Sequence, residues 1–212
     1  MIIAVDGPAA SGKGTIARAL ARHYKLPHLD TGLLYRAVGL TVIDKGGDPA
    51  DAAAAIGACG FPDAMLDDPR LKGDAAGNAA SVVSAIPAVR EALLERQRRF
   101  AAQPGGAVLD GRDIGTVIAP EADAKLFVRA TSAIRARRRH DELVKAGSTL
   151  SYDRVLADIK ARDLRDSTRG AAPLRQANDA ALLDTSYMSV ETAIAHAIEL
   201  VEAQRARSIP PA

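Results

Sequence analysis

The feature that most constrains the fold is a short apolar run, followed at once by a glycine-rich turn and then by a helical pattern. Ile2 to Asp6 has the composition of a buried strand in a parallel sheet. In the stretch from Thr15 to Tyr24, the apolar residues Ile16, Ala19 and Leu20 recur at helical spacing. A strand, a tight turn and a helix in this order predict the beginning of a β-α-β unit.

The same alternation continues along the chain. We expect further strands at 26–30, 107–109, 124–130 and 181–183, and helices at 33–45, 87–100, 132 onwards, 151–166 and 189–205. Thr131, Ser151 and Ser189 are the expected caps of three of these helices. The prediction is a single α/β domain over residues 1–212, with a five-stranded parallel sheet, flanking helices and three layers. Residues 57–84, rich in proline and glycine, are predicted to form a small insertion, and the tail from 208 to 212 is expected to fray.

Residues 7–15 read GPAASGKGT, which has the Gly-x4-Gly-Lys spacing of a P-loop and lies between a predicted strand and a predicted helix. The glycines let several backbone N–H groups converge on phosphate oxygens, and the helix N-terminus adds a favourable dipole. The lysine reaches the terminal phosphates. The predicted ATP-binding residues are Gly7, Pro8, Ala9, Ala10, Ser11, Gly12, Lys13, Gly14 and Thr15.

The loop departs from the common pattern at one position. Gly14 stands where most P-loops have a serine or threonine that binds Mg²⁺, and Thr15 follows it. The variant GKGT is similar to that of nucleoside monophosphate kinases. The candidate Mg²⁺ ligands, directly or through water, are Thr15, Asp30 and Asp110.

Four further segments carry charge or hydroxyl groups at predicted strand ends and loops: LDTGLLYRA, NAASVVSAIPAVREAL, LDGRDIGTV and IKARDLRDSTRGAAPL. Together with the P-loop, they resemble the bacterial cytidylate kinases, in order from Ile2 to about Ser189. The resemblance implies a P-loop NTPase fold with a monophosphate-binding insertion at 57–84 and a lid at about 135–165. It also implies transfer of the γ-phosphoryl group of ATP to CMP and dCMP in pyrimidine nucleotide metabolism, by a cytoplasmic monomer that uses Mg²⁺.

Transfer between two nucleotides brings two highly charged phosphates together, so several cations must converge on the reacting groups. The acceptor phosphate has a second pKa of about 6 and is therefore largely ionised near neutral pH. No general base is required, and catalysis would consist of positioning, charge neutralisation and exclusion of water. The candidate catalytic residues are Lys13, Arg112, Arg138, Arg139 and Arg169, with Arg36 as a further cation.

The resemblance also assigns the acceptor site. It implies that Arg36, Arg112 and Arg169 hold the phosphate, that Arg162 and Asp166 contact the ribose, and that Tyr35 lines the CMP site. Thr31 stands where the family usually has serine, and Lys72 where some members have arginine. Asp113 matches the residue that accepts a hydrogen bond from the C4 amine of cytosine, and Ser81 and Arg90 match its partners at the other polar atoms of the base.

Each assignment has a structural alternative. Arg162, Asp166 and Arg169 have the spacing of one helical face, so an intrahelical ion-pair ladder would also explain them. Asp113 would alternatively orient Arg112. Arg135, Arg138 and Arg139 share a face of the predicted lid helix, which would otherwise be a solvated basic surface. For the lid, the sequence does not distinguish Arg138 from Arg139 as the catalytic arginine.

Composition limits the other function classes. The chain has one cysteine, Cys59, and a net charge of +2, with four tyrosines, three phenylalanines and no tryptophan. A disulfide framework is excluded, and a platform for stacking nucleic-acid bases is not expected. No apolar run reaches the roughly 18 residues of a membrane span, and MIIAVDG lacks the basic region of a secretory signal. Neither Asn78 nor Asn178 begins the Asn-Lys-x-Asp motif of GTPases. A UMP kinase and a nucleic-acid-binding ATPase remain the alternatives.

Overall fold

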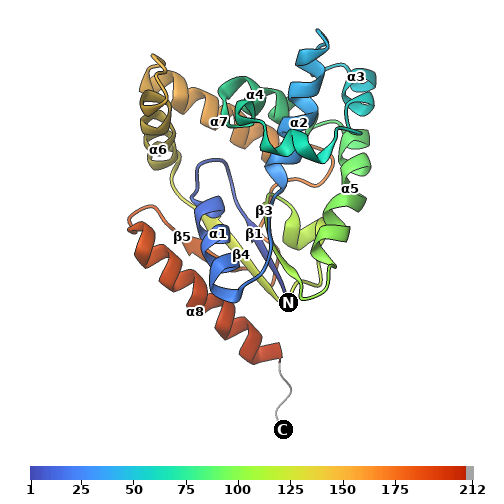
Figure 1. Ribbon diagram of the computed structural model, residues 1–212. Coiled ribbons are helices and arrows are strands. Elements are labelled where there is room, and N and C mark those ends of the chain that lie inside the picture. The colour runs from blue at the N-terminus through green and yellow to red at the C-terminus, as the bar shows by residue number, and fades with distance from the viewer. Residues whose placement is uncertain (209–212) are drawn as a thin grey trace.

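The computed structural model describes residues 1–208 and contains one sheet in which all neighbouring strands run parallel (Figure 1). The strands are β1 (Ile2–Asp6), β2 (His28–Asp30), β3 (Ala107–Gly111), β4 (Ala124–Arg129) and β5 (Ala181–Asp184). Their order across the sheet is β2-β3-β1-β4-β5. This confirms the predicted α/β fold with five parallel strands. The expected fraying of the tail concerns residues 209–212, which lie outside the described part of the chain; Ser208 ends the last helix.

Eight α-helices connect and cover the strands. They are α1 (Lys13–Tyr24), α2 (Thr31–Asp44), α3 (Ala52–Gly57), α4 (Asp74–Val83), α5 (Pro87–Ala101), α6 (Ser132–Lys145), α7 (Tyr152–Thr168) and α8 (Val190–Ser208) within residues 1–208. Two 3-10 turns, η1 (Asp63–Asp67) and η2 (Pro69–Lys72), precede α4, and a π-helical turn, η3 (Ile114–Ile118), follows β3. The three predicted caps are confirmed: Thr131, Ser151 and Ser189 each accept a backbone N–H from the first turn of their helix.

The sheet is covered on both faces, which explains its nearly continuous apolar strands. On one face, Leu20 of α1 and Val201 of α8 belong to the core cluster that includes Val5 and Leu126. On the other, α5 and η3 pack against β3. The molecule therefore has the three predicted layers.

The segment 57–84 contains more ordered structure than its composition indicates. It forms the last residue of α3, the two 3-10 turns and all of α4, and its Leu71 and Val83 are buried in a core that includes Leu34 of α2. The packing of α2 on α4 depends on Gly39, because a Cβ there would lie 2.6 Å from the Cβ of Ala79. Small residues at the contact let the two backbones approach closely.

Several predicted boundaries were wrong. The second strand begins at His28 rather than at residue 26; Pro27 has no N–H and contributes only its carbonyl, which accepts from Val108 N at 2.9 Å. The helix α3 was not predicted; Asp51 caps it by accepting the N–H groups of Ala53 and Ala54.

No helix within residues 1–208 has the length and hydropathy needed to cross a bilayer.

Because all strands are parallel, their carboxyl ends meet at one edge of the sheet, opposite the N-terminus (Figure 1). Helices α4, α6 and α7 lie beyond this edge, with α4 in contact with α7. The predicted site residues lie at this edge or on the elements above it.

Candidate active site

The phosphate loop connects β1 to the first residue of α1. Its backbone requires glycine at two points: a Cβ on Gly7 would lie 2.1 Å from the carbonyl oxygen of Val128, and Gly12 has a φ of +90°. No side chain caps α1 among the described residues, so its first N–H groups are available to an anion. Lys13 Nζ donates to the carbonyl oxygen of Pro8 at 3.4 Å. Burial, with a further contribution from the charge of Arg112, lowers the pKa of Lys13 to about 8.

A cavity of about 520 Å³ lies beside the loop. It is bounded by α1, by Arg138 and Glu142 of α6, and by the segment 185–193 that begins after β5. Thr185 joins these parts: its hydroxyl accepts from Arg138 Nη1 at 3.1 Å and donates to the carbonyl oxygen of Ser11 at 2.9 Å. Thr185 was not among the residues predicted from the sequence, although a polar residue directly after a predicted strand is a candidate for a site at the carboxyl edge of a parallel sheet.

Asp30 is the last residue of β2 and pairs in register with Asp110, the next-to-last residue of β3; both lie close to Lys13. Asp110 Oδ1 is 2.7 Å from His28 Nε2, and Asp30 Oδ1 accepts the N–H of Gly32 at 2.9 Å. Burial and the adjacent Asp110 carboxylate raise the pKa of Asp30.

These carboxylates and the exposed Thr15 offer the hard oxygen ligands that suit Mg²⁺. Asp110 Oδ2 lies 3.6 Å from the point where a Cβ on Gly14 would stand, so it faces the phosphate loop. Within residues 1–208, no three His, Cys, Asp or Glu side chains form a metal cluster.

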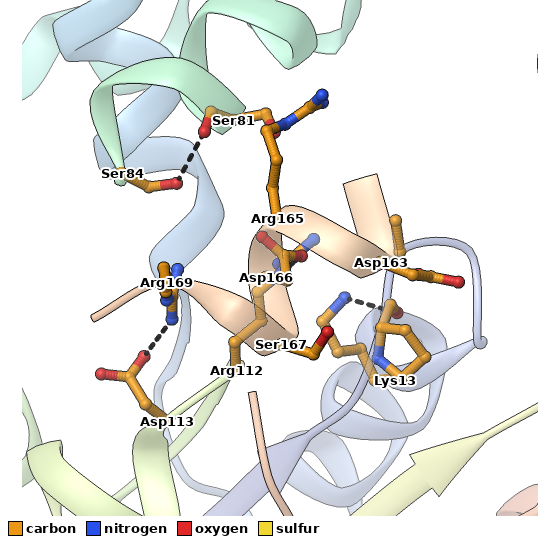
Figure 2. A network of polar contacts seen from close by, with 12 residues as sticks. Lys13, Ser81, Ser84, Arg112, Asp113, Asp163, Arg165, Asp166, Ser167 and Arg169 are labelled. Carbon is orange, nitrogen blue, oxygen red and sulfur yellow. Dashed lines mark hydrogen bonds and ion pairs between the residues drawn. The ribbon is translucent and has the colours of Figure 1, made fainter. Parts of the chain in front are cut away.

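A second, small pocket of about 30 Å³ lies beside β3 and α2. Its lining includes Thr31, Tyr35, Arg90, Arg112, Asp113, Arg162 and Arg169. Asp113 is 5% exposed, accepts a hydrogen bond from Arg90 and lies 3.7 Å from Arg169 Nη2 (Figure 2). Arg112 donates through Nε to Asp166 of α7. Three arginines of the pocket, Arg90, Arg112 and Arg169, are therefore paired with carboxylates of the same chain.

Hydroxyl groups of the predicted acceptor site lie on either side of this pocket. Thr31 Oγ1 donates to the carbonyl oxygen of Asp110 at 2.9 Å. Ser81 of α4 is buried and accepts from Arg165 Nε at 3.1 Å (Figure 2). Arg165 was not among the residues predicted from the sequence, although it lies in the segment IKARDLRDSTRGAAPL between the predicted residues Arg162 and Asp166.

Arg36 and Arg162 line a further cavity of about 280 Å³ between α4, α6 and α7. Arg36 Nη1 donates to the carbonyl oxygens of Leu71 at 2.6 Å and Gly73 at 3.3 Å. Arg162 Nε is buried and has no hydrogen-bond partner among residues 1–208. Burial, together with the charge of Arg112, lowers the pKa of Arg162 to about 9.

Two expectations about the arginines need correction. Arg169 does not share a helical face with Arg162, because α7 ends at Thr168; Arg169 Nε donates to the carbonyl oxygen of Ala172 at 2.8 Å. Arg135 does not belong to a solvated basic face; it is 5% exposed and forms two hydrogen bonds to Asp163, at 2.9 and 2.5 Å.

The two candidate lid arginines lie in different surroundings. Arg138 approaches the phosphate loop, and a Cβ on Gly12 would lie 3.8 Å from its Nη1. Arg139 is ion-paired with Asp74, the first residue of α4. The predicted cations are thus gathered around the carboxyl edge of the sheet rather than spread over separate faces.

Comparisons with known proteins agree with this arrangement. Residues 3–203 match the family model for cytidylate kinase. A cytidylate kinase of Xanthobacter autotrophicus is 60% identical over 206 residues, which cover 97% of this chain and 99% of the relative. That of Rhodopseudomonas palustris is 56% identical, covering 97% and 98%. A crystal structure of an uncharacterised protein from Eubacterium ventriosum has the same fold, with 15% identity, a TM-score of 0.56 and coverage of 96% and 99%.

Proposed function

This chain belongs to the cytidylate kinase family and phosphorylates CMP with ATP, and from this premise we propose which of its residues carry the reaction. The observation that carries the assignment is the convergence of two sets of cations. Ala9 and Ala10 of the phosphate loop line the same cavity of about 280 Å³ as Arg36 and Arg162. The phosphate loop and the acceptor arginines therefore act on one cleft, as transfer between two nucleotides requires.

ATP would bind with its phosphates on residues 7–15. The backbone N–H groups at the start of α1 and the Lys13 ammonium would neutralise the phosphate oxygens. The cavity of about 520 Å³ has room for the nucleoside beside the loop. When bound, Mg²⁺ would neutralise phosphate charge, with Thr15, Asp30 and Asp110 as the residues that hold it, directly or through water.

CMP would bind in the pocket around Asp113. Arg36, Arg112 and Arg169 would hold the acceptor phosphate, and Arg162 and Asp166 the ribose, with Thr31 and Tyr35 lining the site. The acceptor oxygen is ionised near neutral pH, so the arginines need only orient and neutralise it. The pocket of about 30 Å³ is too small for a nucleotide, so the surrounding elements must separate to admit CMP.

The cytosine ring would be read by Asp113, Arg90 and Ser81. A carboxylate accepts a hydrogen bond from the C4 amine of cytosine and meets an acceptor in uracil. Arg90 already donates to Asp113 and lies over the ring of Tyr35, at 5.5 Å from its centroid. The resemblance to the family also makes dCMP an expected substrate.

Residues 57–84 would act as the monophosphate-binding insertion and about 135–165 as the lid. The choice between the two lid arginines now favours Arg138, which lies at the phosphate loop, over Arg139, which is engaged by Asp74. The resemblance to the family also supports a monomer that works in the cytoplasm.

The function is tested by a coupled assay of ADP release with CMP, dCMP, UMP and AMP as acceptors. We expect rapid turnover with CMP and dCMP and slow turnover with UMP and AMP. An equal rate with UMP would contradict the proposed reading of the base. ADP release without any acceptor would indicate an ATPase instead.

A further inference from the structure

Asp6 is a buried carboxylate that none of the proposed binding steps uses. It is the last residue of β1, directly before the phosphate loop, and is 5% exposed. Its Oδ1 accepts the N–H of Ile114 at 2.8 Å, and its Oδ2 accepts the N–H of Gly115 at 2.8 Å. Burial, together with the nearby charge of Asp113, raises the pKa of Asp6 to about 7. A carboxyl group that is costly to ionise at this buried position thus accepts two backbone N–H groups that lie 108 and 109 positions away in the sequence.

The two N–H groups belong to the first turn of η3, which begins at Ile114. An aspartate directly before a helical turn normally accepts such groups with its own side chain. Asp113 occupies that position, yet its side chain makes no capping hydrogen bond. Its carboxylate turns instead towards Arg90 and Arg169 in the acceptor pocket (Figure 2).

We propose that Asp6 is a positioning residue for base recognition. By accepting the N–H groups of Ile114 and Gly115 from a neighbouring strand, it takes over the capping role and leaves the carboxylate of Asp113 free to face the base. This inference rests on the proposed function of Asp113. A residue of β1 would then affect which nucleotide the enzyme accepts, although no residue of β1 lines the acceptor pocket.

The surroundings of the contact keep it in place. A Cβ on Gly115 would lie 3.1 Å from Lys125 Cδ and 3.4 Å from Asp6 Oδ2, so the side chains of Lys125 and Asp6 pack closely against the turn. The next residue, Gly7, donates its N–H to the carbonyl oxygen of Gly111 at 3.3 Å. Asp6 and Gly7 thus connect the start of the phosphate loop to the segment that carries Arg112 and Asp113.

The substitution Asp6→Asn tests the proposal, because asparagine keeps the size of the side chain but turns an N–H₂ donor towards one of the two N–H groups. We expect the ratio of kcat/KM for CMP to that for UMP to fall about five- to tenfold, the effect of losing a cap. The KM for ATP should stay within about twofold. The matched control is Asp123→Asn: Asp123 Oδ2 accepts the N–H of Ile2 at 2.6 Å, at the opposite end of β1, and the ratio should not change.

A double-mutant cycle separates this inference from the function on which it rests. Asp113→Ala alone should lower the CMP preference by about 5- to 150-fold. If it does not, the proposed role of Asp113 fails. If it does, adding Asp6→Asn to Asp113→Ala should cause no further loss of preference. An additive loss, or an unchanged preference in Asp6→Asn alone, would overturn the role of Asp6 while the role of Asp113 stands.

The wild-type chain provides a measurement that does not depend on the folding of a variant. Amide hydrogen exchange at Ile114 and Gly115, followed by NMR spectroscopy without ligand, should be slow because both N–H groups are held by Asp6. Exchange as fast as that of exposed loop amides would show that the turn is not held, and the proposal would fall.

Discussion

Arg139 in α6 forms an ion pair with Asp74, the first residue of α4, and so joins the proposed lid to the proposed insertion. The adjacent Arg138 has a different partner: it donates to the carbonyl oxygen of Thr185 at 2.7 Å. The two neighbours in sequence therefore have different tasks. One contact connects two elements above the sheet, and the other lies at the phosphate loop.

This difference predicts unequal effects of two substitutions. Arg138→Ala should lower kcat about 100-fold, because it removes a donor near the transferred phosphoryl group. Arg139→Ala should change kcat only a few-fold, since its main loss is a partly exposed ion pair. Steady-state rates at saturating ATP and CMP provide the comparison. The reverse order of effects would make Arg139 the catalytic arginine.

Lys13→Ala should abolish turnover. The ammonium of Lys13 is the cation that the phosphate loop itself supplies, and no other lysine lines the cavity beside it. The rate is measured by ADP release, with circular dichroism to check folding. Lys160→Ala, a change at an exposed lysine of α7, is the control and should leave the rate unchanged. Normal turnover in the Lys13 variant would refute the assignment of the ATP site.

The affinity for ATP should fall as the pH rises above about 8. The pKa of Lys13 is lowered from 10.5 to about 8 mainly by burial, so the free protein loses the ammonium in this range. Binding must then restore the proton, and Kd should increase by up to about tenfold per pH unit. Isothermal titration calorimetry at pH 7, 8, 9 and 10 measures this. A Kd that does not change between pH 7 and pH 10 would show that Lys13 does not lose its proton in this range.

The same group has the opposite effect on the stability of the ligand-free protein. Between about pH 8 and pH 10.5 the unfolded chain binds a proton at Lys13 that the folded chain does not. This group's contribution to the free energy of unfolding should therefore rise with pH across that window. Chemical denaturation of the wild type and of Lys13→Met isolates the contribution, which the variant should lack.

Arg162→Met should stabilise the ligand-free protein and weaken CMP binding. The buried Nε of Arg162 lacks a partner within the described chain, and burial lowers the pKa of its guanidinium to about 9. Methionine has a similar length and no charge to desolvate, so the free energy of unfolding should rise by about 1–2 kcal/mol.

Thermal denaturation measures the expected gain in stability, and the KM for CMP measures the expected loss of binding. Arg154→Met is the control, because Arg154 lies on the same helix but is exposed and pairs with Asp158 at 3.3 Å. Its stability should change by less than about 0.5 kcal/mol. A loss of stability in Arg162→Met would mean that Arg162 has a structural role.

Most of the sheet could be predicted, because parallel strands buried on both faces leave clear apolar runs. The insertion was harder. Its helix α4 packs through Ala79 and Ala80 against Gly39 of α2, and such small residues give a weak hydrophobic pattern. Helix α3 is short and rich in alanine, so it too lacks a clear periodicity.

The sequence predicted that the candidate cations would lie near one another, because several of their motifs follow strand ends. It could not identify their partners. The bond from Arg165 to Ser81 spans 84 positions, and that from Ile114 to Asp6 spans 108. Such pairings are set by how distant elements pack, and a linear pattern does not contain that information.

The pairing of the pocket arginines with internal carboxylates has a consequence for simple ions. Arg112 already has Asp166 as its partner before any nucleotide arrives, so an incoming anion must displace a carboxylate rather than occupy an empty positive site. A free inorganic phosphate can replace the carboxylate only through its own charged group and makes no further contacts in the pocket. A nucleotide also brings a sugar and a base that make their own contacts. We therefore expect the pocket to bind a nucleotide in preference to a free inorganic anion, without a barrier that excludes small anions.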